Sequence, residues 1–225
     1  LMATLVMGMA AGAFYGLAPV YALAMELSTR QTGMFMGVTI FAGMVSQFPL
    51  SWLSDRYDRQ LLLFCVSILF TVASLALAVL PHPDFYVLLA IAFVSSMAMF
   101  SLYPLGVAIA NDHVEAERRV SLTACLLMAF GIGACIGPLI TGAVMQPLGG
   151  SVLYFFFALC GCVIAVITWI RKRKPAIVVD APLPHVVMPD SLATSPLAVV
   201  LNPTVDEEAI QEVMVDTDGD LADEE

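Results

Sequence analysis

The sequence predicts an all-α, polytopic membrane protein with six transmembrane helices. Five stretches contain no Asp, Glu, Lys or Arg: 1–25, 31–54, 60–83, 85–111 and 120–170. The last stretch is about twice as long as the others, and a turn-like Gln-Pro-Leu-Gly-Gly-Ser sequence at 146–151 interrupts it near its middle, so we divide it into two helices. An apolar run of about 18 residues or more is long enough to cross the hydrocarbon core of a bilayer as a helix.

Basic residues follow almost only the even-numbered helices. Arg30 lies in the connection after the first helix. The other eight follow the second, fourth and sixth helices: Arg56, Arg59, Arg118, Arg119, Arg171, Lys172, Arg173 and Lys174. The positive-inside rule assigns this side to the cytoplasm. We therefore predict a multi-pass protein of the plasma membrane, the inner membrane in a bacterium, with both ends of this segment cytoplasmic.

Two parts of the chain differ in charge. Residues 1–174 hold nine basic and seven acidic side chains, whereas residues 175–225 hold twelve acidic and no basic ones, together with six prolines. A chain of the second kind cannot bury enough apolar surface to offset the entropy of ordering. We expect a six-helix transmembrane domain over 1–174 and a mostly disordered, acidic cytoplasmic tail over 175–225.

The residues of the predicted helices argue against several classes of protein. All five cysteines lie within these helices without the two-residue spacing common in zinc sites, so we expect no metal and no other cofactor. Neither paired carboxylates nor a nucleophile with a base occur at membrane depth. We therefore expect neither an enzyme nor a nucleic-acid-binding protein.

Small residues indicate close packing between helices. Gly8, Gly12 and Gly16 repeat every four residues in the first helix, and Gly133 and Gly137 do so in the fifth. Such spacing lets two backbones approach each other in lipid. We interpret both rows as packing seams.

Two prolines lie inside predicted helices. Pro104 in the fourth helix and Pro138 in the fifth should each remove a backbone hydrogen bond and bend the helix. Bent helices suit a gate. Curvature without motion is the default interpretation, because proline is common in membrane helices.

The connection between the second and third helices carries the most specific motif. Residues 51–60 read Ser-Trp-Leu-Ser-Asp-Arg-Tyr-Asp-Arg-Gln. This sequence resembles the signature of the major facilitator superfamily, in which Gly, three residues, Asp, Arg or Lys, one residue, Gly and basic residues link the second and third helices of a six-helix half. Asp55, Arg56 and Arg59 match the signature, whereas other residues replace both glycines.

Further stretches resemble the C-terminal half of the YcaD-like branch of this superfamily. They are residues 37–59, 102–104 and 133–138, and the resemblance spans most of 1–170. The fourth helix lacks the intramembrane arginine that is frequent in the N-terminal half. Residues 133–138 are also similar to an antiporter motif of the first half, which points the other way. The resemblance implies half of a transporter, built of two inverted three-helix repeats.

The charged connection predicts a gating latch. Asp55, which we expect near the start of the third helix, can accept hydrogen bonds from free N–H groups at a helix N-terminus. Arg56 and Arg59 can reach phosphate groups or the three acids within residues 112–117. These contacts would join the cytoplasmic helix ends in one conformation and release them in another. The alternative is that both arginines only set the topology.

Three polar residues are candidates for the solute cavity. Gln47 comes first, because an amide in lipid is costly unless it faces protein or water. Tyr103 and Tyr15 follow. For each, hydrogen bonding between helices is the alternative role. No charged residue lies at the midplane, so any proton-coupling residue is absent or belongs to another part of the protein.

Together these features predict a secondary active transporter that moves a small solute by alternating access. Because the chain begins with Leu1 and its first helix lacks a polar lead, we expect an N-terminal six-helix half upstream. A membrane scaffold or regulatory subunit that recruits a cytosolic partner through its acidic tail is the alternative. The solute, the direction of transport and any coupling to protons stay open.

Overall fold

The computed structural model describes residues 1–80, 83–112, 114 and 118–173. These residues form six α-helices and no strand: α1 (Met2–Ala24), α2 (Thr29–Arg56), α3 (Arg59–Val79), α4 (Phe85–Asn111), α5 (Arg119–Leu148) and α6 (Val152–Arg173). All six are long and apolar enough to cross a membrane, which confirms the predicted fold class. The tail expected over 175–225 lies outside the described residues.

Local signals set several helix ends. Ser28 begins α2 with a capping box, in which its hydroxyl accepts from the Gln31 backbone N–H at 3.4 Å and the Gln31 side chain accepts from the Ser28 N–H at 2.9 Å. Asp58 precedes α3, and its carboxylate accepts from the Gln60 N–H at 3.0 Å. Gly149 ends α5 with a φ of 89°, a conformation that favours glycine. These caps keep three of the connections short.

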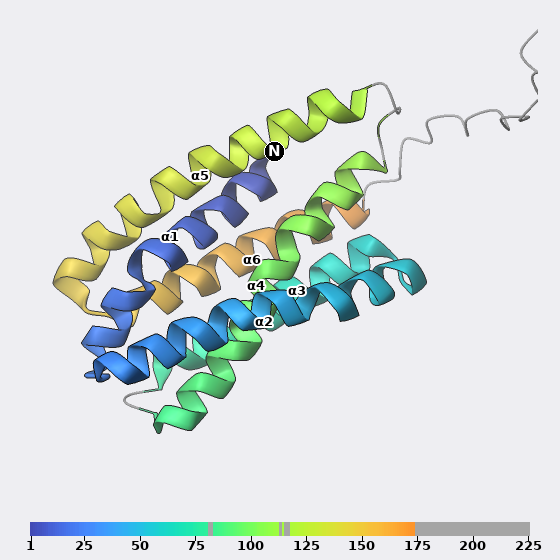
Figure 1. Cartoon of the computed structure of the whole chain (residues 1–225). Coiled ribbons are helices and arrows are strands. Elements are labelled where there is room, and N and C mark those ends of the chain that lie inside the picture. Colours follow the sequence, from blue (N-terminus) through green and yellow to red (C-terminus); the bar gives the residue numbers. More distant parts are fainter. Residues whose placement is uncertain (81–82, 113, 115–117, 174–225) are drawn as a thin grey trace, which may run out of the picture. The chain divides into compact units, whose positions relative to one another are not determined.

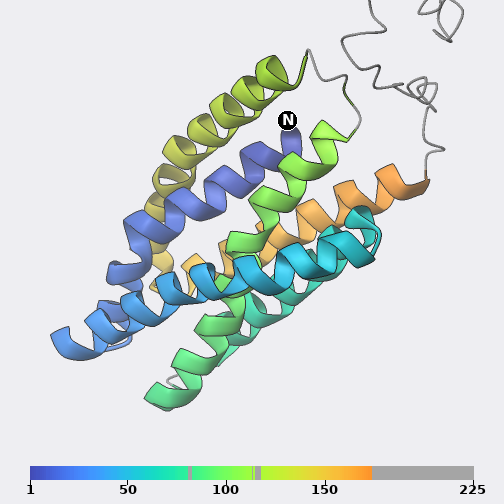
Figure 2. The same ribbon diagram turned by 45° about the vertical axis from the view of Figure 1, so that its right-hand side comes forward.

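The helices pack as two groups of three that use equivalent partners. The closest pairs are α1 with α5, α2 with α4, α3 with α6, α3 with α4 and α1 with α6. Exchanging α1 with α4, α2 with α5 and α3 with α6 leaves this set of pairs unchanged, and the weaker pairs obey the same exchange. Figure 1 and Figure 2 both show α5 lying along α1. Since three helices cross a membrane an odd number of times, the second group enters it from the opposite side, as in an inverted repeat.

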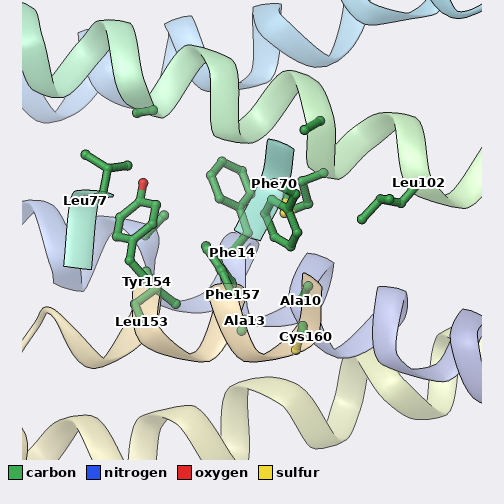
Figure 3. Packing of buried hydrophobic residues seen from close by; sticks show 14 of the residues in the cluster. Ala10, Ala13, Phe14, Phe70, Leu77, Leu102, Leu153, Tyr154, Phe157 and Cys160 are labelled. Atoms are coloured by element: carbon green, nitrogen blue, oxygen red, sulfur yellow. The ribbon is translucent and has the colours of Figure 1, made fainter. Parts of the chain in front are cut away.

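Aromatic side chains fill much of the core. The rings of Tyr21 and Tyr154 meet edge to face with centroids 4.7 Å apart, and those of Phe70 and Phe157 lie 5.9 Å apart. All four side chains are buried. Figure 3 shows Phe70 and Phe157 side by side, with Tyr154 one turn away on α6. The rings join α1, α3 and α6 by van der Waals packing, which is a main source of attraction between helices in lipid.

Hydroxyl groups in the core are largely satisfied within their own helices. Thr39, Ser67 and Thr168 each donate to the carbonyl oxygen four residues earlier, at 2.7–2.9 Å. One hydroxyl pair crosses between helices, because Ser74 of α3 and Ser95 of α4 are hydrogen-bonded at 2.9 Å. These hydrogen bonds satisfy the hydroxyl donors within the bundle.

Candidate functional site

The predicted latch residues lie at one end of the bundle, where α2, α4 and α6 end and α1, α3 and α5 begin. We name it the basic end after its residues Arg56, Arg59, Arg118, Arg119, Arg171 and Lys172. Here α2 continues through Arg56, and α3 begins at Arg59. Asp55 therefore lies in the last turn of α2, and its expected position near the start of the third helix is wrong. Asp58 caps α3 instead, because it immediately precedes the free N–H groups of that helix.

Arg59 holds the start of α3 against the end of α4. One guanidinium nitrogen of Arg59 donates to both carboxylate oxygens of Asp112, at 2.7 and 2.8 Å. The two side chains are 36% and 48% exposed, so solvent screens the ion pair and its contribution to stability is small. Asp112 is one of the three acids that we expected Arg59 to reach; the other two, at 115 and 117, lie outside the described residues.

Two further contacts at the basic end escaped sequence analysis. Arg56 places its guanidinium carbon 4.3 Å from the ring centroid of Trp52, one turn earlier on α2. Lys172, near the end of α6, lies 3.8 Å from a carboxylate oxygen of Asp58. The four-residue spacing of Trp52 and Arg56 is a signal that could have revealed the first contact. The second joins segments far apart in the sequence, and no local pattern predicts it.

The glycines of α1 and α5 form one interlocked contact, which we name the glycine seam. A Cβ added to Gly8 or Gly12 would overlap the backbone carbonyl of Phe130 or Ala134 on α5. Conversely, a Cβ at Gly137 would overlap the carbonyl oxygen of Met9 on α1. The two backbones therefore touch, and only hydrogen atoms fit between them.

The two remaining glycines of these rows, Gly133 and Gly16, lie in the same contact. A Cβ at Gly133 would overlap the carbonyl oxygen of Leu5, whereas one at Gly16 would come within 3.3 Å of the Pro138 side chain. At Gly16, therefore, α1 contacts a side chain of α5 instead of its backbone. Pro138 packs at this end of the seam, beside α1.

A cleft separates α2 from α4, the equivalent pair, whereas α1 and α5 are in backbone contact. The Phe100 ring occupies the space beside Gly43, so that an added Cβ would lie 2.6 Å from a ring carbon. One turn closer to the basic end, a cleft of about 170 Å³ separates the two helices. It is lined by Gln47, Leu50, Ser51, Ser54, Pro104, Leu105 and Ala108. This cleft is the candidate site.

Of the three predicted cavity residues, only Gln47 lines the cleft. Tyr15 is 56% exposed and stacks near Phe100, with ring centroids 6.1 Å apart. Tyr103 turns toward α5, where its ring packs 4.6 Å from that of Phe130. The structure thus places Tyr15 against Phe100 and Tyr103 at a different helix contact.

Two serines of the cleft were not among the predicted residues. Ser51 and Ser54 follow Gln47 by four and seven residues, so all three side chains lie along one face of α2. The spacing was visible in the sequence and could have identified them. These side chains offer an amide and hydroxyls, which bind by hydrogen bonds and carry no charge. Within the described residues, no three His, Cys, Asp or Glu side chains gather as they would around a metal ion.

Comparison with known proteins places these features in a family. A family model of the Major Facilitator Superfamily matches residues 1–209. An uncharacterized MFS-type transporter of Yersinia enterocolitica is 31% identical over 154 residues, and one of Enterobacter sp. is 33% identical over 154 residues. The YcaD transporter of Escherichia coli is 31% identical over 157 residues. Each match covers 68% of this chain and 39% of the relative, so the chain spans well under half the length of these relatives.

Proposed function

Because this chain belongs to the major facilitator superfamily, we propose that residues 1–174 form the C-terminal half of a secondary active transporter for a small solute. The observation that carries the proposal is the exchange of α1, α2 and α3 with α4, α5 and α6, which preserves every helix pair. Inverted repeats allow one bundle to reach two related states, one open to each side of the membrane. The relatives, which are named as transporters, support this class over an enzyme.

The mechanism that we propose is alternating access. This half supplies one wall of a central cavity, and a further six-helix half supplies the other wall. The proportion of each relative covered by the chain, 39%, leaves room for such a half. The two halves would rock against each other around a solute, and bends at Pro104 and Pro138 would let α4 and α5 follow that motion.

We assign the latch to contacts at the basic end. The Arg59–Asp112 pair joins α3 to α4, and the Asp58–Lys172 pair joins α3 to α6. Both pairs are exposed and weak, which suits contacts that must break in each cycle. Asp55 and Arg56 lie in the last turn of α2 and are exposed, so they are positioned to meet a partner in another conformation.

Orientation can be tested with introduced cysteines. We propose that the basic end faces the cytosol. In intact cells and a background without native cysteines, a thiol introduced by Tyr57→Cys should be shielded from an impermeant reagent, and one introduced by Pro83→Cys should react. Labelling of the Tyr57→Cys protein from outside would reverse the orientation.

Solute uptake tests the function itself. Cells that produce the whole protein should accumulate at least one of a panel of labelled small solutes, and uptake should persist after removal of residues 175–225. Ala108→Trp, which fills the cleft, should abolish uptake at equal expression. If uptake is absent and a cytosolic protein is lost from the membrane on removal of 175–225, the scaffold alternative holds instead.

A second test concerns the chain by itself. Residues 1–225 should insert into a membrane without transporting, because a cavity between two halves needs both walls. Solute flux through liposomes that contain the purified, monomeric chain would contradict a mechanism based on two halves.

A further inference from the structure

The cleft between α2 and α4 begins at the basic end and runs toward the middle of the bundle. At 1.5 Å per residue, Ser54 lies about 3 Å and Gln47 about 14 Å along α2 from its last residue, Arg56. The hydrocarbon core of a bilayer is about 30 Å thick, so Gln47 lies close to half way through it. The cleft therefore brings polar groups from the membrane surface to nearly its midplane.

The polar side chains of the cleft differ from several core hydroxyls in their hydrogen bonding. In the described residues, no hydrogen bond joins the side chains of Gln47, Ser51 or Ser54 to another group. By contrast, the hydroxyl of Ser46, the residue before Gln47, donates to the Gly43 carbonyl at 2.7 Å. Gln47 and Ser51 are exposed and Ser54 is partly buried, so these groups are available to a hydrogen-bonding occupant.

Pro104 removes one backbone hydrogen bond of α4 beside the cleft. Because proline has no N–H, the carbonyl of Phe100 loses the partner that it would have in an unbroken helix. Pro104 lines the cleft, and the Phe100 ring fills the space beside Gly43 one turn further in. An occupant would therefore meet donors and acceptors on α2 and the Pro104 ring on α4.

The lining offers no counter-ion to a charged occupant. It consists of one amide, two serines, a proline and three apolar residues, so no charged side chain lines it. An ion bound there would exchange part of its hydration for neutral groups without gaining a counter-ion. The volume, about 170 Å³, is close to the roughly 150 Å³ of an engineered cavity that holds benzene.

We infer that the α2–α4 cleft binds an uncharged, hydrogen-bonding solute, or a portion of one, of about the size of a single six-membered ring. Gln47, Ser51 and Ser54 make the hydrogen bonds. Identifying this occupant as the transported solute rests on the proposed function, whereas the selectivity of the cleft against charge does not.

Thiol labelling tests the cleft without knowledge of the solute. The whole protein, in a cysteine-free background and reconstituted in liposomes open to both sides, would carry Ser51→Cys. Three methanethiosulfonates of similar size serve as probes: uncharged hydroxyethyl, anionic sulfonatoethyl and cationic trimethylammonioethyl. Each rate is divided by the rate with a free thiol in solution. Only a hydrated thiol ionises to the reactive thiolate, so a thiol facing lipid reacts with none of them.

We expect the uncharged probe to react roughly tenfold or more faster than either charged probe, because the charged probes must enter without a counter-ion. Ala108→Trp should slow the uncharged probe by a similar factor. Tyr57→Cys, at the exposed end of α2, is the matched control: it should not distinguish the probes to this extent, and Ala108→Trp should leave its rates unchanged. Ser54→Cys replaces Ser51→Cys if the latter protein does not fold.

Two outcomes would overturn the inference. Equal reaction of all three probes at the Ser51→Cys position would show that the cleft accepts charge. No reaction with any probe, while Tyr57→Cys reacts, would show that the cleft is dry or covered by protein. Neither outcome measures solute uptake. The labelling experiment can therefore contradict the inference about the cleft without contradicting the transport proposal.

Discussion

The α1–α5 and α2–α4 pairs occupy equivalent places in the bundle, yet one is closed and the other open. At the glycine seam, Gly12 and Gly137 lie against backbone atoms of the facing helix. At the equivalent contact, Gly43 faces the Phe100 ring, and a cleft follows one turn further on. The topology thus sets which helices are neighbours, and the side chains decide whether neighbours touch. We expect α1 and α5 to move as one body and α2 and α4 to be able to separate.

The largest expected effect comes from closing space in the glycine seam. Gly137→Ala should lower the free energy of unfolding by about 1–3 kcal/mol, because the new methyl meets the Met9 backbone, which cannot move aside as a side chain can. Unfolding by dodecyl sulfate in mixed micelles measures the change.

Gly131→Ala is the matched control on the same helix. Nothing lies within 4 Å of a Cβ at Gly131, and alanine favours a helix over glycine by about 1 kcal/mol. This variant should be as stable as the parent or more stable. Equal losses from both substitutions would mean that α1 and α5 are not in backbone contact.

A smaller effect is expected at the equivalent glycine of the open pair. Gly43→Ala should cost about 0.5–1.5 kcal/mol, since the Phe100 ring can rotate away at the price of a poorer rotamer. A displaced ring would also alter the α2–α4 contact one turn from the cleft, so labelling of Ser51→Cys by the uncharged reagent should change in rate. A loss as large as that of Gly137→Ala would show that the two helix pairs are equally rigid.

The ion pair at the basic end should contribute less still. Arg59→Gln and Asp112→Asn should each cost about 0.2–1 kcal/mol, and the double variant should cost no more than the larger single change. Molar salt should reduce these differences by screening. Additive losses in a double-mutant cycle would indicate that the two side chains act separately.

Removal of one cleft hydroxyl should barely affect stability. Ser51→Ala should change the free energy of unfolding by no more than about 0.5 kcal/mol, because its hydroxyl has no partner among the described residues. Ser67→Ala is the control: its buried hydroxyl donates to the Leu63 carbonyl, and its loss should cost about 1 kcal/mol. Uptake should fall with Ser51→Ala and stay normal with Ser67→Ala. If uptake stayed normal with Ser51→Ala and fell with Ser67→Ala, the cleft would have a packing role and would not bind the solute.

Much of the fold could be predicted from local sequence. Apolar runs located all six helices, because spanning a bilayer requires length and hydrophobicity that few other segments possess. The glycine rows of α1 and α5 were visible as four-residue repeats, and the family resemblance rested on the charged motif at residues 51–60. Each of these signals lies within a single helix or connection.

Tertiary structure alone decided which surfaces meet. Phe48 is 85% exposed whereas Phe35 and Phe70 are fully buried, although nothing in their hydrophobicity distinguishes them. Likewise, Arg59 selects Asp112, and Tyr103 turns to α5 instead of joining Gln47. In water, apolar side chains identify the core, but in lipid the packed and exposed faces of a helix are both apolar. The choice of partner then depends on shape and on polar contacts between segments distant in sequence, which hydrophobic periodicity does not record.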